Sequence, residues 1–261
     1  MSAQLHRFPA EETSLKGKVS EAEWEMRVNL AACYRLAAHY RMTDKIYTHI
    51  SARVPGPDEH FLINAYGLLF DEITASSLVK LDIDGAILQD TTGLGVNEAG
   101  YVIHSAIHRA RHDVTCVMHT HTRAGVAVSA QKNGLLPISQ HSMRFYNQVA
   151  YHDYEGVALY LEEQQRLVGD LGDKKVMILR NHGLLTAGAE VREAFELMYY
   201  LEMSCQIQLD AMSGGAELNF PSKEVCERVV AQFGRTDRPS TRKDWPTLLR
   251  MLDRTDTSYR N

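Results

Sequence analysis

The chain has 261 residues, of which 44% are hydrophobic and 23% are charged, and its formal net charge is −5. These values favour one large α/β core over two small domains, exclude extensive disorder and argue against a nucleic-acid partner. No window approaches the roughly 20 apolar residues of a membrane span, and the N-terminus lacks a signal-peptide core. The four cysteines form no CxxC pair and are typical of buried thiols in a reducing compartment. We therefore expect a soluble cytoplasmic protein.

The first part of the chain predicts an arm, a helix and several strands. Residues 1–20 are polar and irregular, and we interpret them as an N-terminal arm. Ser20 and Glu23 make a capping-box pattern, and the apolar residues that follow at steps of three and four predict a helix buried on one face. Residues 46–88 are β-rich, with turn formers at 55–60 and a hairpin turn predicted at 82–85.

A second helix is expected to begin near Asn97. Its apolar side contains Val102 and Ile107, whereas His104, His108 and His112 lie on the other side at helical spacing. We interpret these histidines as a solvated polar face, with a metal-binding ladder as the alternative.

Two later apolar strands each run into histidines. Residues 114–118 lead to His119 and His121, and residues 175–180 lead to His182. Side chains alternate along a strand, so His119 and His121 point to the same side and can share one ion. If the two strand ends meet, three imidazoles converge in the pattern of a catalytic zinc site with open coordination positions. A long helix is predicted over about 191–212, and the more polar residues 216–261 are interpreted as a C-terminal extension.

Several segments together resemble the class II aldolase/adducin family. They are YTHISARV, FLINAYGLLFDEITASSLVK, the stretch GVNEAGYVIHSAIHRARHDVTCVMHTHTRAGVAVSA, NGLLPIS, VAYHDYEG and RNHGLL. The resemblance covers about residues 22–215, so we expect the domain at 21–215, and it is closer to the adducin head and its bacterial relatives than to sugar-phosphate aldolases. It implies a three-layer α/β/α fold with a mostly antiparallel central sheet, in a homotetramer. It also implies that His119, His121 and His182 bind a divalent metal, zinc first, with manganese or iron as alternatives.

The sequence departs from the sugar-phosphate aldolases where those enzymes carry a glutamate. The matching position here is Gly100, and Glu98, the nearest carboxylate, is rotated from it by roughly 200° at a helix start. The phosphate-binding positions correspond to Thr48-His49 and Glu98-Ala99, and a carboxylate there would repel a phosphate dianion.

These features predict a carbon–carbon lyase, either a decarboxylase or a retro-aldolase, that acts on a small non-phosphorylated keto or hydroxy acid. The candidate catalytic residues are Glu98, Tyr151, His152 and Tyr154, and the candidate substrate-binding residues are His49, Arg144 and Tyr146. Two alternatives stay open. One is a non-catalytic adducin-like scaffold, although residues 216–261 contain no basic run of the adducin-tail kind, and the other is an iron-dependent oxygenase.

Overall fold

The computed structural model describes residues 14–156, 161–234 and 243–261. In these ranges the strands form one eight-stranded sheet with the order β4-β3-β2-β1-β5-β8-β7-β6. The strands are β1 His49–Arg53, β2 His60–Ile63, β3 Val79–Asp82, β4 Ile87–Gln89, β5 Cys116–Thr120, β6 Val149–His152, β7 Val176–Leu179 and β8 Gly183–Gly188. Neighbouring strands run antiparallel except for the parallel pair β6 and β7. The predicted mostly antiparallel sheet and the hairpin at Asp82–Gly85 are confirmed.

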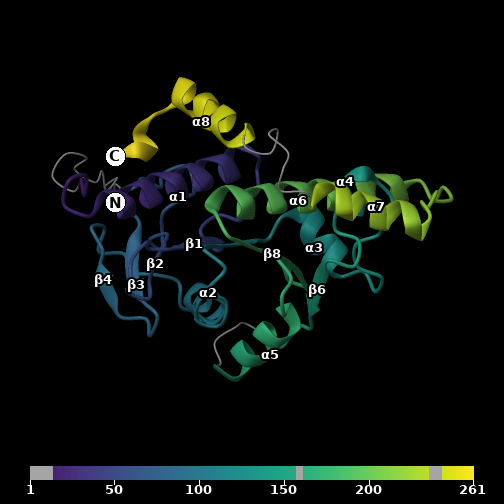
Figure 1. Ribbon diagram of the computed structural model, residues 1–261, viewed down its shortest axis with the longest axis horizontal. Helices are drawn as coiled ribbons and strands as arrows, with labels where there is room; N and C mark the ends of the chain where they lie inside the picture. The colour runs from purple at the N-terminus through teal and green to yellow at the C-terminus, as the bar shows by residue number, and fades with distance from the viewer. Residues whose placement is uncertain (1–13, 157–160, 235–242) are drawn as a thin grey trace, which may run out of the picture.

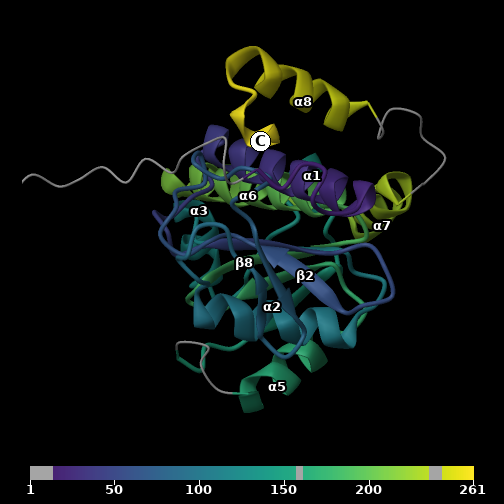
Figure 2. The same ribbon diagram turned by 90° about the vertical axis from the view of Figure 1, so that its left-hand side faces the viewer.

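Helices cover both faces of the sheet (Figures 1 and 2). One face carries α1 Glu21–His39, α3 Arg123–Ser129, α4 Gln140–Met143 and α6 Val191–Ser213, and the other carries α2 Glu98–Ala110 and α5 Leu161–Leu171. The predicted three-layer α/β/α architecture is therefore confirmed. None of the described helices is long and apolar enough to cross a membrane.

Each side of the sheet has its own apolar core. The larger core joins the sheet to α1 and α6 and includes Leu30, Ile50 and Met198, which are at most 1% exposed. The smaller core joins it to α2 and α5 through Ile107, Leu171 and neighbouring strand residues. Burial on both faces explains why β7 is a continuous apolar run and why β5 and β8, which are buried at every position, are also largely apolar.

The start of α1 follows the predicted capping pattern only in part. Ser20 Oγ accepts a hydrogen bond from the Glu23 amide at 3.2 Å, as expected for an N-cap. The Glu23 carboxylate does not return the bond. It accepts instead from Arg27 and Lys80 at 2.9 and 2.8 Å, because Arg27 is fully buried and requires a partner.

The two ends of the chain are tied to the same side of the molecule. The predicted N-terminal arm lies mostly outside the described residues, but Leu15 is buried and its amide donates to Ser76 Oγ. At the other end, α7 Lys223–Phe233 and α8 Asp244–Thr255 precede the short 3-10 helix η2 Ser258–Arg260. The segment from residue 243 folds back onto α1, and the amides of Ala75 and Ser76 donate to the carbonyls of Tyr259 and Asn261. Residues 243–261 are therefore packed against the folded domain.

The histidines of α2 correct one expectation. His104 and His108 are 0% and 1% exposed, so they do not form a solvated face. Their side of α2 faces β1, where Ser51 hydrogen-bonds to both rings. His112, beyond the helix end, is exposed as predicted.

Candidate metal centre

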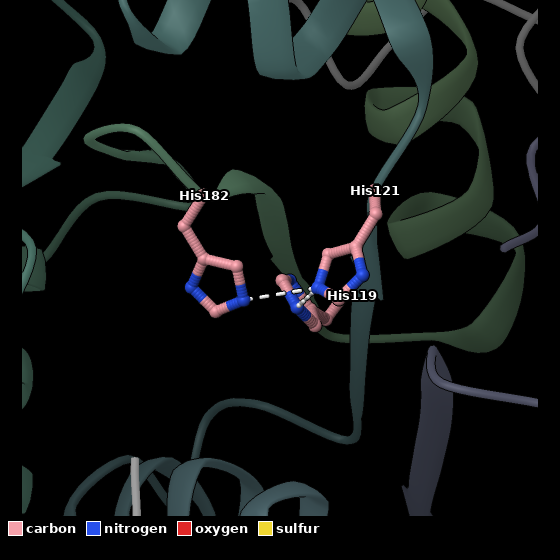
Figure 3. A group of neighbouring side chains, drawn as sticks. All are labelled: His119, His121 and His182. Atoms are coloured by element: carbon pink, nitrogen blue, oxygen red, sulfur yellow. Dashed lines mark hydrogen bonds between the residues drawn. The ribbon is translucent and has the colours of Figure 1, made fainter. Parts of the chain in front are cut away.

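The three predicted ligands come from two adjacent strands. His119 lies within β5 and His121 follows that strand, where Thr122 caps the start of α3. His182 lies in the tight turn between β7 and β8. β5 and β8 are paired, so the sheet itself brings the three imidazoles together (Figure 3).

Close backbone packing holds this corner of the sheet. A Cβ added at Gly183 would lie 2.4 Å from the Thr120 carbonyl oxygen, so only glycine allows β8 to approach the end of β5 this closely. Asn181 supplies the turn with a positive φ of 55°, a conformation that asparagine tolerates better than most residues. His182 is thereby fixed beside His121.

The Nε2 atoms of the three rings converge. His119 Nε2 lies 2.8 Å from His121 Nε2, which lies 2.9 Å from His182 Nε2. His119 Nδ1 donates to the Leu184 carbonyl at 2.9 Å, and His121 Nδ1 donates to the Asp44 carboxylate at 3.1 Å. Since each neutral imidazole carries one N–H, the Nε2 atoms of His119 and His121 face each other as lone pairs.

Burial favours the neutral form of two of the three rings, His119 and His182. Burial, reinforced by the neighbouring histidines, lowers the pKa of His119 well below its usual value. Burial also lowers the pKa of His182 to about 4. Converging lone pairs are repulsive without a shared cation, and ligand nitrogens about 2.0–2.1 Å from one zinc ion would lie roughly 3 Å apart. The donor set therefore fits a divalent metal, and its Nδ1 partners are of the kind that orient metal-bound histidines.

The cluster opens into a cavity of about 370 Å³ on the α2 side of the sheet. Its lining residues are Asp44, Tyr47, His49, Asn97, Ile103, His119, His121, Tyr154, Gly156 and His182. This lining contains no lysine or arginine among the described residues, and Asp44 is its one carboxylate.

The position that matches the aldolase glutamate is filled by a histidine ring. A Cβ added at Gly100 would lie 2.6 Å from His49 Cδ2 and 3.0 Å from His49 Nε2. Any side chain at residue 100 would therefore have to displace the ring. Glu98, two residues earlier, is exposed and does not line the cavity.

Of the other candidate residues, two line the cavity and the rest lie outside its lining. Tyr154 lines the cavity, with its ring centroid 6.1 Å from that of His182, and His49 lines it from β1. His152 is buried beside the cavity and hydrogen-bonds to Asp170 at 2.8 Å. Tyr151 lies further away, where its hydroxyl accepts from the Leu135 amide.

Neither Arg144 nor Tyr146 lines the cavity. The Arg144 guanidinium lies over the Tyr200 ring, 3.8 Å from its centroid, and is 3.6 Å from Glu196. These contacts place Arg144 against α6, which covers the face of the sheet opposite to α2. Tyr146 follows α4 and does not line the cavity.

Sequence reasoning missed three polar residues of the cavity lining. Asp44 and Tyr47 lie in the connection between α1 and β1, and only the folded chain brings this connection to His121. Asn97, expected only as a helix cap, also lines the cavity. The one available signal was the cluster of polar residues directly before His49.

Comparison with known proteins identifies the family of the chain. Residues 28–209 match the model of the class II aldolase and adducin N-terminal domain. A crystal structure of an aldolase II superfamily protein from Pseudomonas syringae has a TM-score of 0.91 and 63% identity, and the match covers 95% of this chain and 100% of that one. L-fuculose 1-phosphate aldolase from Glaciozyma antarctica has a TM-score of 0.80 and 27% identity, over 92% and 93% of the two chains.

Rat alpha-adducin is 43% identical over 90% of this chain, and the match covers 34% of the adducin. The chain belongs to the class II aldolase and adducin family. This family consists typically of divalent-metal-dependent lyases, and its adducins show that non-catalytic members exist.

Proposed function

We propose that the protein is a metal-dependent carbon–carbon lyase acting on a small, non-phosphorylated keto or hydroxy acid. The observation that carries the proposal is the convergence of three imidazoles at a cavity with no lysine or arginine in its described lining. His119, His121 and His182 would hold the metal, zinc first, with manganese or iron as alternatives. A divalent cation on three imidazoles polarises a substrate carbonyl and stabilises the negative charge that develops when an adjacent carbon–carbon bond breaks.

The cavity argues against a phosphorylated substrate. Phosphate sites in proteins use arginine, lysine or helix N-termini. The described lining offers neither of the two basic residues, and Asp44, its one carboxylate, would repel a dianion. A substrate with one carboxylate and one keto or hydroxyl group has less charge to neutralise.

The reaction type follows from the residue at position 100. A glycine there supplies no carboxylate to remove a carbon-bound proton, and a placed general base is worth about 10²–10⁴-fold in rate. Decarboxylation requires no such base. Retro-aldol cleavage requires only the removal of a hydroxyl proton, for which Tyr154 and His49 are the candidates in the lining. His152 is buried, so it could take the hydroxyl proton only if the cavity wall around it moved.

The decisive experiment measures metal in protein purified without an affinity tag. We expect about one divalent ion per chain, lost in a His119→Ala/His182→Ala variant, and release of CO₂ or an aldehyde from a panel of keto and hydroxy acids. A metal-free protein whose stability is unchanged by chelator would exclude the proposal. The predicted homotetramer and cytoplasmic location are tested by light scattering and cell fractionation.

The similarity to alpha-adducin supports a second candidate, a non-catalytic scaffold. A scaffold would turn over no acid in the panel and would keep its partners after loss of the metal. The third candidate, an iron-dependent oxygenase on the same fold, would contain iron and consume oxygen with substrate.

A further inference from the structure

His49 is a fourth buried imidazole beside the three candidate ligands. It begins β1 and is the register partner of His119 across the β1–β5 pair, with the two ring centroids 5.1 Å apart. Its Nδ1 lies 2.7 Å from His104 Nε2. Within the described part of the chain its Nε2 has no hydrogen-bond partner, although the ring is only 4% exposed and lines the cavity. A ring nitrogen without a partner, on a largely buried ring that lines a cavity, is available to a ligand.

Behind His49 a hydrogen-bonded chain crosses from β1 to α2. His104 Nδ1 lies 2.6 Å from Ser51 Oγ, which lies 2.7 Å from His108 Nε2. Ser51, His104 and His108 are all at most 1% exposed. A serine hydroxyl has one hydrogen to donate, so it donates to one ring and accepts from the other. The chain can therefore run in either of two directions, and the direction sets the tautomers of His49, His104 and His108 together.

The ring of His49 is also confined sterically. The backbone of α2 at Gly100 lies so close that an added Cβ would be 2.6 Å from His49 Cδ2. His119 lies beside the ring and His104 meets its Nδ1 edge. Three elements thus fix one orientation, with Nε2 as the remaining polar atom.

We propose that His49 contacts the substrate through Nε2, and that His104, Ser51 and His108 are positioning residues that hold its ring and set its tautomer. This inference rests on the proposed function and adds to it the hydrogen-bonded chain that orients His49 toward the substrate.

The proposal narrows the ligand class. An imidazole nitrogen can pair with a hydroxyl group in either tautomer, and with a carbonyl oxygen when it carries the hydrogen. The oxygen that meets His49 would therefore be the keto or hydroxyl oxygen of the acid.

The test uses zinc-loaded full-length protein and acetohydroxamate, a small bidentate zinc ligand with two neighbouring oxygens. In His49→Ala we expect zinc content to be retained and hydroxamate affinity to fall by about 5- to 10-fold, the value of one hydrogen bond. His49→Gln, which returns an amide near the Nε2 position, should recover part of the loss. Ser51→Ala should weaken binding by about 2- to 5-fold, whereas His112→Gln, outside the network, should bind as the parent protein does.

A second measurement separates positioning from general damage. In ¹⁵N-histidine NMR spectra, we expect single neutral tautomers for His49 and His104, and averaged signals for both in Ser51→Ala. Parent-like hydroxamate affinity in His49→Ala, or averaged tautomers in the parent protein, would overturn the inference while leaving the metal site intact. A parent protein that takes up no zinc would instead overturn the proposed function itself.

Discussion

The Asp44 carboxylate lies 3.1 Å from Nδ1 of His121, so an acid on the α1–β1 connection orients a histidine that follows β5. Asp44 is half-exposed, with a side-chain exposure of 44%, so little stability depends on the contact itself. Its effect should instead be on the metal, because an acceptor on Nδ1 sets the tautomer and raises the basicity of Nε2.

We therefore expect Asp44→Asn to weaken zinc binding by about 10- to 100-fold with little change in stability. Competition with a fluorescent zinc chelator measures the affinity. Asp58→Asn, in an exposed loop between β1 and β2, is the matched control and should bind zinc as the parent does. Equal affinities for the parent and Asp44→Asn would show that Asp44 does not act on the metal.

Gly100→Ala should lower the free energy of unfolding by about 1–3 kcal/mol, because the new methyl group must displace the His49 ring. Urea unfolding measures the change. Gly169→Ala in α5, where an added Cβ meets nothing within 4 Å, should be neutral or stabilising by up to about 1 kcal/mol. His49→Ala combined with Gly100→Ala should recover part of the loss, and strictly additive effects would contradict the proposed clash.

The buried imidazoles should make stability depend on pH. His108 is neutral in the fold because burial, with the charge of Arg53, lowers its pKa to about 3, whereas the unfolded residue titrates near its usual 6.5. The unfolded state therefore binds more protons between these values, so the stabilisation is complete above pH 6.5 and is lost as pH falls toward 3. One such residue removes about 2 kcal/mol between pH 6.5 and 5.

Urea unfolding of the chelator-treated protein from pH 7.5 to 5 measures this slope. His108→Gln should flatten it, whereas His112→Gln, whose side chain is 71% exposed, should not. An unchanged slope in His108→Gln would mean that His108 is not the group that titrates.

Trp245→Ala should destabilise the protein by about 3 kcal/mol. The indole is 9% exposed, lies against Phe195 and donates to Asn29 Oδ1 at 3.1 Å. Thermal unfolding measures the loss, and Phe220→Ala, at a site 51% exposed, should be nearly neutral. A parent-like melting temperature in Trp245→Ala would mean that α8 is a loosely held extension.

The sequence predicted what local patterns determine. Alternation placed His119 and His121 on one side of a strand, and the apolar runs before them and before His182 marked strands that are buried on both faces. The meeting of these strands followed from the family resemblance, because periodicity carries no information on which strands pair. Helical spacing put His104 and His108 opposite the apolar stripe of α2, but it could not show that β1 would bury that side as well.

Other features depended on contacts between distant parts of the chain. Asp44 and Tyr47 reach the cavity only after the α1–β1 connection folds over His121. The polar composition of residues 216–261 concealed α8, whose few apolar residues lie on one side of the helix and pack on α1 and α6. Arg144, which was expected to hold a substrate carboxylate, is engaged by Tyr200 and Glu196.

The pairing of β5 with β8 has a consequence for how the family diversifies. All three candidate ligands belong to these two strands or to their ends, so their spacing is set by the backbone ladder of the sheet. The cavity walls come from other elements, namely the α1–β1 connection, the start of α2 and the segment around Tyr154. Substitutions in the cavity walls can therefore change which ligand fits without changing the spacing of the three candidate ligands.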